Sequence, residues 1–344
     1  MLSPARVVPA WWPGIARALV TTVLLCLPLC VSAAVPLLRV AVISDLNGAY
    51  GSAEYDTAVR GAVAALRRLQ PGLVISTGDM VAGQRLHPVL QADRVEAMWS
   101  AFHAVVTDPR RGSGIPLAVT PGNHDASAYP LFTHEREIYA AQWTQRVPSL
   151  EFVDRAGYPF HYAFAVGGVL FVSLDVTRVG VVDRAQKAWL DALLSRHGDG
   201  YAYRVVFSHL PLFAFTEGRE TEISADAELE ALLRMHRVDL YLSGHHHAFY
   251  PGFRDGVAYI GQACLGAGPR RLLGSSGRSR RAVTWLEFSG EGVTVDALSG
   301  VALDERIDVQ ALPPRIASRL GTLVRLDLAP ETTAPRVTAA GASE

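Results

Sequence analysis

Five short motifs of this sequence combine carboxylate, amide and imidazole side chains, the groups through which proteins bind transition-metal ions. In chain order they are Asp45-Leu46-Asn47, Gly78-Asp79, Gly122-Asn123-His124-Asp125, His209-Leu210-Pro211 and Gly244-His245-His246-His247. A single motif of this kind is weak support for a site, because Asp, Asn and His beside glycine or proline are common in turns. Five of them in one chain, each after an apolar run, favour one shared metal site.

The predicted secondary structure brings the motifs together. The sequence predicts strands within 37–43, 72–76, 115–120, 201–211 and 238–247, each leading into one motif, helices over 55–70, 89–106 and 184–197, a hairpin over 160–175 turning at Gly167–Gly168, and late strands over 256–263, 281–288 and 292–298. This order predicts an α/β layered domain with mixed sheets. Because sites in open α/β sheets gather beyond the carboxyl ends of strands, we expect Asp45, Asp79, Asn123, His209 and His245 to form one cluster.

The order of the motifs resembles that of the calcineurin-like metallophosphoesterase superfamily, over roughly residues 38–298. The resemblance implies a four-layer α-β-β-α sandwich with two mixed β-sheets and a site for two metal ions. By this resemblance, Asp45 and His247 would bind the first ion, Asn123, His209 and His245 the second, and Asp79 both. His124 would face the substrate without binding metal.

The chemistry expected of such a site is hydrolysis of a phosphoric ester. Two cations ~3.5–4 Å apart offset the negative charge of the phosphate and lower the pKa of bound water, so that a metal-bridging hydroxide serves as nucleophile. Nitrogen and oxygen ligands together suit divalent or trivalent Mn, Fe, Zn or Co better than Mg or Ca. We expect His124 to act as general acid or transition-state donor, and Asp125 to fix the tautomer of its ring.

Two positions leave alternatives open. The commonest family form has His where this chain has Asn47, and some branches, including the purple acid phosphatases, compensate with a tyrosine near the second motif, where this chain has Met80-Val81. Asn47 is expected either to bind the first metal weakly through its amide oxygen or to form an Asx turn beside Gly48. His246, at the variable position of its motif, is expected either to support the neighbouring ligands or to be exposed.

A basic segment over residues 268–282 carries Arg270, Arg271, Arg278, Arg280 and Arg281 and no acidic residue. It is either a solvated loop or a source of guanidinium groups that attract anionic substrates or hold a phosphate remote from the scissile bond. The whole chain has a formal net charge of −1, so no nucleic-acid partner is expected.

The two ends of the chain predict segments outside the main domain. Residues 1–33 join basic residues to an apolar run and a small-residue cleavage site at Ala33, the layout of a secretory signal peptide. Cleavage would leave a secreted or periplasmic protein with no stable membrane span, and an uncleaved anchor is the alternative. Residues 34–300 are expected to form the metallophosphoesterase domain, 301–330 a C-terminal extension packing on it, and 331–344 a disordered tail.

These features predict a secreted or periplasmic dinuclear-metal hydrolase, a phosphatase or phosphodiesterase, whose partner is a small-molecule phosphate ester. The alternative is a catalytically silent binding protein that keeps the fold, since Asn47 departs from the common ligand set. The presence of His124, which only the chemistry requires, favours the enzyme.

Overall fold

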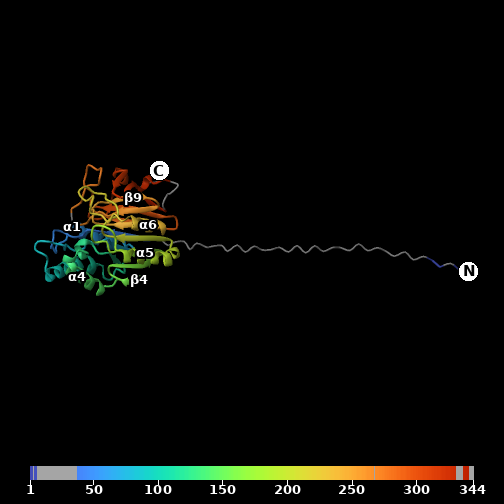
Figure 1. Cartoon of the computed structure of the whole chain (residues 1–344), viewed down its shortest axis with the longest axis horizontal. Coiled ribbons are helices and arrows are strands. Elements are labelled where there is room, and N and C mark those ends of the chain that lie inside the picture. Colours follow the sequence, from blue (N-terminus) through green and yellow to red (C-terminus); the bar gives the residue numbers. More distant parts are fainter. Residues whose placement is uncertain (3, 6–36, 267, 331–335, 341–344) are drawn as a thin grey trace. The chain divides into compact units, whose positions relative to one another are not determined.

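The computed structural model describes residues 1–2, 4–5, 37–266, 268–330 and 336–340 (Figure 1). Internal contacts divide the chain into two units, Met1–Ala33 and Ala34–Glu344, and the account below concerns the second. The predicted signal peptide over residues 1–33 lies almost entirely outside the described residues. Within the described ranges, none of the helices combines the length and the apolar character that crossing a bilayer requires.

The first sheet has seven strands and joins the beginning of the domain to its end. Six strands run in the order β13-β12-β11-β1-β2-β3, and β16 also pairs with β12. The strands are β1 (Leu38–Ile43), β2 (Leu73–Ser76), β3 (Leu117–Val119), β11 (Ala282–Phe288), β12 (Val293–Ser299), β13 (Glu305–Arg306) and β16 (Val337–Ala339). Strands β1, β2 and β3 are parallel, whereas β11 is antiparallel to β1, so the sheet is mixed.

The second sheet has nine strands in the order β14-β15-β9-β10-β8-β7-β6-β5-β4. They are β4 (Glu151–Gly157), β5 (His161–Val166), β6 (Val169–Ser173), β7 (Tyr203–Ser208), β8 (Leu240–Ser243), β9 (Tyr250–Arg254), β10 (Val257–Gly261), β14 (Arg315–Ser318) and β15 (Gly321–Arg325). Strands β6, β7, β8 and β10 are parallel and the outer strands antiparallel. The predicted hairpin is β5–β6, whose turn at Gly167–Gly168 has positive φ at both residues, as a two-residue type I′ turn requires.

Helices connect the strands and cover the outer faces of the sheets. They are α1 (Thr57–Leu69), α2 (Ala92–Phe102), α3 (Asn123–Ala126), α4 (Thr133–Thr144), α5 (Arg184–His197) and α6 (Ala227–Met235), with short helical turns at His103–Thr107, Asp108–Arg110, Pro130–Phe132, Gly198–Gly200, Val309–Ala311 and Leu326–Leu328. Aspartate side chains at Asp56, Asp183 and Asp226 accept backbone N–H groups at the starts of α1, α5 and α6. These caps explain why the helices begin where they do, since first-turn N–H groups have no partner within the helix.

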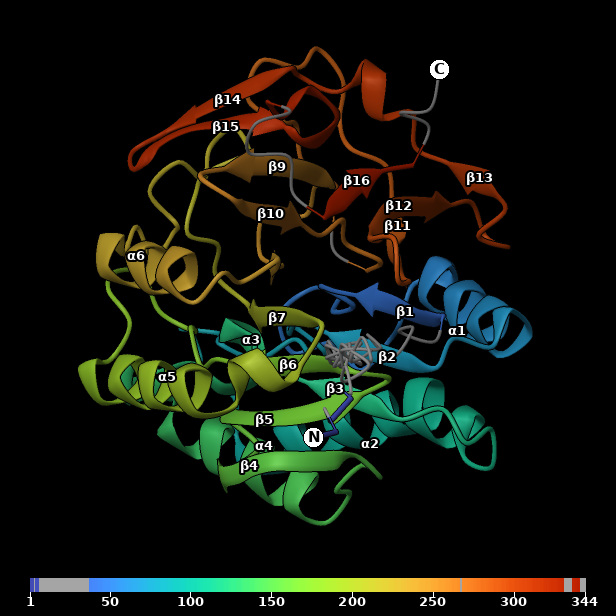
Figure 2. The ribbon, with the colours of Figure 1, turned by 90° about the vertical axis from the view of Figure 1, so that its right-hand side faces the viewer.

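Three hydrophobic cores separate four layers, and Figure 2 shows the strands between α1 and α2 on one side and α5 and α6 on the other. In β1, Val40 and Val42 enter the core between the sheets, whereas Ala41 and Ile43 enter the core that includes residues of α1, α2 and α4. The third core joins the outer face of the second sheet to α5 and α6. Because successive side chains of a β-strand point to opposite faces, one strand contributes side chains to the cores on both sides of its sheet. The predicted four-layer α-β-β-α sandwich with two mixed sheets is confirmed.

The last described residues correct the prediction of a disordered tail over 331–344. Val337–Ala339 form β16, which pairs in parallel with β12, and Val337 and Ala339 are buried in the core between the sheets. The prediction is wrong for residues 336–340, because two alternate apolar side chains are enough to fix a three-residue strand on an existing edge. Within the segment 301–330, Ile316 of β14 and Leu323 of β15 are buried in the core beside α5 and α6.

Candidate metal centre

Five loops at the carboxyl ends of strands from both sheets meet at one site. The motifs follow β1, β2 and β3 of the first sheet and β7 and β8 of the second. Four residues of these loops, Asp45, Asp79, His245 and His247, have left-handed φ values of 50°, 55°, 65° and 52°. Residues other than glycine rarely adopt this conformation, and when they do they cluster at functional sites.

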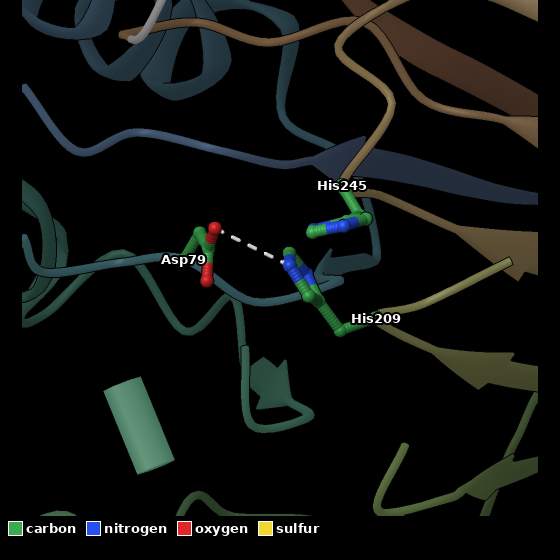
Figure 3. Close-up of side chains that lie close together, drawn as sticks. All are labelled: Asp79, His209 and His245. Atoms are coloured by element: carbon green, nitrogen blue, oxygen red, sulfur yellow. Dashed lines mark ion pairs between the residues drawn. The ribbon is translucent and has the colours of Figure 1, made fainter. Parts of the chain in front are cut away.

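Asp79, His209 and His245 form a buried group whose candidate ligand atoms all lie within 4.8 Å of one another (Figure 3). The Oδ2 atom of Asp79 lies 3.2 Å from Nε2 of His209, and Oδ1 of Asn123 lies 2.9 Å from the same nitrogen. Gln84 accepts a hydrogen bond from Nδ2 of Asn123 at 2.6 Å, which turns the amide oxygen toward His209. The residues predicted for the second metal ion therefore converge around Asp79.

Asp45, Asn47 and His247 provide a second set of candidate ligands. The Oδ1 atom of Asp45 lies 3.1 Å from Nε2 of His247 without hydrogen-bond geometry, and within the described chain the buried Oδ1 atoms of Asp45 and Asn47 have no hydrogen-bond partner. Leaving such atoms unpaired costs about 1–3 kcal/mol each. Two ligands of one cation, each ~2.0–2.2 Å from it, lie about as far apart as the Asp45 oxygen and the His247 nitrogen. A bound cation would thus satisfy these atoms.

Each histidine ring of the site has a polar partner at one of its two nitrogens, which fixes the ring. Nδ1 of His209 lies 2.8 Å from the Thr77 carbonyl and Nδ1 of His247 lies 3.2 Å from the Gly268 carbonyl, which leaves Nε2 of both rings for the site. His245 is held the other way round, with Nε2 3.0 Å from Oε2 of Glu222. Among the described residues, none forms a hydrogen bond to Nδ1 of His245, so this nitrogen is available to the site. Anchoring of the second ring nitrogen by a carbonyl or carboxylate is the usual environment of a metal-binding histidine.

Glu222 and Arg219 are site residues that no sequence motif indicated. Glu222 forms an ion pair with Arg219, whose Nη1 also lies 2.9 Å from Nε2 of His245. Both residues lie in the irregular segment between His209 and α6, where neither periodicity nor a recognisable spacing marks them. Only the fold brings them to the outer edge of the His245 ring.

Glu222→Gln is expected to weaken metal binding about 10–100-fold, the usual cost of losing an anchor behind a metal-binding histidine. The amide carries no charge to favour the proton on Nε2, whereas the Arg219 guanidinium, which can only donate, still faces that nitrogen and favours its unprotonated form. The tautomer with Nδ1 free is therefore less strongly preferred. Calorimetric titration of the metal-free protein with Mn²⁺ measures the change in metal affinity. Glu220→Gln is the matched control, because Glu220 is exposed on the same loop. Equal affinities for wild type and Glu222→Gln would exclude the anchoring role.

His124 reaches the site from α3 and presents one free ring nitrogen. Its Nδ1 lies 2.8 Å from the Gly83 carbonyl, so Nδ1 donates and Nε2 remains available, 3.8 Å from Oδ2 of Asp79. Its backbone N–H donates to Oδ1 of Asp79 at 2.9 Å, and the ring of Tyr50 packs against its ring with centroids 5.1 Å apart.

The prediction that Asp125 fixes the tautomer of His124 is wrong. The carboxylate of Asp125 instead accepts hydrogen bonds from the backbone N–H groups of Met80, Val81 and Gly122 at 2.7–2.9 Å. Consecutive residues of a helical turn do not face each other, which is why Asp125 cannot reach the ring of its neighbour. Burial and the charge of Asp79 raise the pKa of Asp125 to about 7. Asp125 therefore links the second and third motif loops through hydrogen bonds.

The charges of the centre support each other in the metal-free protein. Burial disfavours the charged forms of both Asp79 and His209, but each stabilises the charge of the other. The carboxylate of Asp79 raises the pKa of His209 to about 9, and His209 and His124 hold the pKa of Asp79 below its usual value. Burial, followed by the charges of His209 and Arg219, holds the pKa of His245 well below its usual value. A neutral imidazole is the form that binds a cation.

His246 is fully buried, which decides between the two alternatives left open by the sequence. Its Nδ1 accepts a hydrogen bond from the Phe215 N–H at 3.2 Å, and its Nε2 donates to the Glu222 carbonyl at 3.2 Å. His246 therefore holds the loop that carries Glu222, and the alternative of an exposed side chain is wrong.

Comparison with known proteins places these features in context. A sequence model of the family described as calcineurin-like phosphoesterase matches residues 38–249. The chain is 32% identical to purple acid phosphatase 22 of Arabidopsis thaliana over 161 residues, which are 46% of this chain and 36% of that protein. It is 28% identical to purple acid phosphatase 18 of the same plant over 164 residues, 46% of this chain and 35% of that protein. The chain thus spans about a third of the length of these curated relatives.

Two solved structures share the fold at low sequence identity. A dimetal phosphatase from Danio rerio superposes with a TM-score of 0.55 at 16% identity, covering 78% of this chain and 98% of that one. The purple acid phosphatase PPD1 from yellow lupin (Lupinus luteus) gives a TM-score of 0.58 at 16% identity, covering 79% of this chain and 53% of that one. At this identity the likeness establishes the architecture alone.

Proposed function

Because the chain belongs to the calcineurin-like phosphoesterase family, we propose that it is a dinuclear-metal hydrolase of phosphoric esters. The observation that carries the proposal is the pair of buried oxygens of Asp45 and Asn47, which have no hydrogen-bond partner among the described residues, beside the group formed by Asp79, His209 and His245. Buried polar atoms without partners are rare in folded proteins, and these two oxygens lie among residue types that bind cations.

The residues present suit two transition-metal ions such as Mn, Fe, Zn or Co. Asp45, Asn47 and His247 would hold the first ion, Asn123, His209 and His245 the second, and Asp79 would bind both. When bound, the two cations would neutralise phosphoryl oxygens and supply an activated water near neutral pH.

Proton donation to the leaving oxygen is the step that a side chain of this protein would perform. The oxygen of water forms a new bond to phosphorus, the bond from phosphorus to the ester oxygen breaks, and that oxygen leaves with a proton. His124 is the proposed donor of this proton from Nε2, in the form of its ring that carries a proton on both nitrogens, because Nδ1–H donates to the Gly83 carbonyl and fixes the ring. The proton that the attacking water loses replaces the one that Nε2 gives to the leaving oxygen. The products are an alcohol and phosphate, or a phosphate monoester when the substrate is a diester.

Turnover by the full chain tests this proposal directly. The protein is stripped with a chelator, reloaded with Mn²⁺ or Zn²⁺, and assayed with p-nitrophenyl phosphate and bis(p-nitrophenyl) phosphate. We expect two ions per chain and hydrolysis of at least one ester that depends on the added metal. Binding of two ions without turnover of either ester would favour the alternative, a catalytically silent binding protein.

We further propose that the protein acts outside the cytoplasm, secreted or periplasmic. The support is the order of basic residues, apolar run and small residues within positions 1–33. The mass of the mature N-terminus after expression in the native host distinguishes cleavage after Ala33 from an uncleaved anchor.

A further inference from the structure

A cavity of about 500 Å³ lies away from the metal centre, where the connection from α2 to β3 meets the end of α4. Helices α2 and α4 pack side by side (Figure 2), and the walls of the cavity come from within residues 107–117 and 143–149. The cavity lies at the amino end of β3, whereas Asn123 and His124 follow the carboxyl end of the same strand. None of the candidate metal ligands lines the cavity, so a ligand bound there would belong to a separate site.

The walls of the cavity are mainly apolar. The apolar side chains that line it are Ile115, Pro116, Leu117, Trp143, Val147 and Pro148. Trp143 is buried and Val147 is 41% exposed, so these walls extend from the core to the surface. The volume falls within the range of roughly 300–1,000 Å³ that small-molecule sites occupy, which is far more than a simple inorganic ion fills. Walls of this kind favour a ligand with an apolar body.

Three arginines, Arg110, Arg111 and Arg146, line the same cavity. Asp108 is the carboxylate beside them, and its Oδ1 atom lies 3.1 Å from Nε of Arg111 and 3.4 Å from Nη1 of Arg146. Among the residues that the structure describes, no other carboxylate forms an ion pair with any of the three arginines. The cavity wall therefore carries more positive than negative charge at neutral pH.

Arg110 is the arginine of this group that has no carboxylate partner within the described chain. Its Nη2 donates to the carbonyls of Ile115 and Pro116 at 3.2 and 3.4 Å, whereas its buried Nη1 has no hydrogen-bond partner among the described residues. The residue is 6% exposed, and burial lowers its pKa to about 10, so it remains charged at neutral pH. Because salt screens a buried charge less than an exposed one, Arg110 favours an anion in the adjoining cavity.

Arg111 and Arg146 offer donors that a ligand can reach. Their side chains are 67% and 33% exposed. A guanidinium group has five N–H donors, so the shared carboxylate of Asp108 cannot accept from all the donors of both arginines. The remaining donors suit a carboxylate, which accepts paired hydrogen bonds from a guanidinium group.

We propose that this cavity binds a small organic acid, in which a carboxylate is joined to an apolar body. The carboxylate would meet Arg111 and Arg146, within the field of the buried Arg110, and the apolar body would lie against Trp143 and its apolar neighbours. The inference does not rest on the proposed phosphoesterase function, because no candidate metal ligand takes part.

Calorimetric titration of the metal-loaded full chain with phenylacetate tests the proposal. Phenylacetamide keeps the apolar body without the charge, and acetate keeps the carboxylate without the body. We expect phenylacetate to bind with a Kd below about 1 mM and both other probes to bind at least about tenfold more weakly. Excess inorganic phosphate, which has no apolar body, should not displace phenylacetate.

Two variants of the cavity wall locate the binding site. Arg110→Gln removes the buried charge and should weaken phenylacetate binding about tenfold or more. Val147→Glu places a carboxylate on the wall at an exposed position, where it should not disturb folding, and should weaken binding by a similar factor. Val301→Glu is the matched control, because it makes the same substitution at a valine that is 66% exposed in the turn after β12. The control should retain the wild-type affinity.

The possible results each decide the proposal. Equal affinities for phenylacetate and phenylacetamide would exclude recognition of the charge, and displacement by phosphate would exclude the role of the apolar body; either result overturns the proposal. Wild-type affinity in Val147→Glu would place the bound phenylacetate elsewhere and also overturn it, whether or not Arg110→Gln folds. Failure of the chain to hydrolyse any phosphate ester would overturn the proposed function and leave this inference unchanged.

Discussion

Asp79→Asn is expected to lower kcat/KM by at least about 10³-fold and to leave fewer than two metal ions per chain. Two metal ions contribute several kcal/mol of charge stabilisation to the transition state, and each 1.4 kcal/mol corresponds to about a factor of ten in rate. The carboxylate is fully within the protein and its two oxygens have different contacts: Oδ2 faces His209 and Oδ1 accepts the His124 N–H. An amide nitrogen at either position would be a donor where a ligand or an acceptor is needed.

The test of Asp79→Asn combines activity with metal content. Elemental analysis should find one ion or none, and addition of excess Mn²⁺ should not restore turnover. Asp93→Asn is the control, because Asp93 is exposed on α2 and its substitution removes the same charge at a position away from the site. Two tightly bound ions in Asp79→Asn, or activity within tenfold of the wild type, would contradict the shared-ligand role.

His124→Ala is expected to lower kcat about 10²–10⁴-fold while metal content stays normal. The side chain is not among the candidate ligands, and the contact of residue 124 with Asp79 runs through the backbone N–H, which alanine retains. Metal content therefore separates the role of this residue from that of Asp79.

The dependence on leaving group identifies what His124 does. Loss of a proton donor should slow an alkyl phosphate, whose alkoxide leaves poorly, much more than p-nitrophenyl phosphate, which needs little protonation. His197→Ala, at the end of α5, is the control for removal of a histidine elsewhere. Equal losses for both esters would exclude the role of general acid and leave only charge stabilisation by the ring.

The α/β class with mixed sheets and the strand ends that carry the motif residues were accessible from local patterns of the sequence, whereas the four-layer sandwich was expected from the resemblance of the motifs to a family. Apolar runs ending in Asp, Asn or His marked β1, β2, β3, β7 and β8, and parallel strands of one domain place such ends at one edge. The paired glycines marked the β5–β6 turn, because a type I′ turn needs positive φ at both positions. Strands β4, β9 and β13–β16 and helices α3, α4 and α6 were not predicted, since short or weakly periodic segments are fixed by the surfaces on which they pack.

The supporting contacts of the centre were decided only by the tertiary structure. The sequence named His245 but not Glu222, which lies 3.0 Å from its Nε2, and it assigned to Asp125 an orienting role that the Gly83 carbonyl fills. It grouped five arginines by their spacing, although Glu217, Glu305 and Asp56, from other parts of the chain, pair with three of them. A motif reports which residue types follow a strand. Which atom of a side chain meets which partner depends on loops that pair across the fold, and therefore on contacts between residues far apart in the sequence.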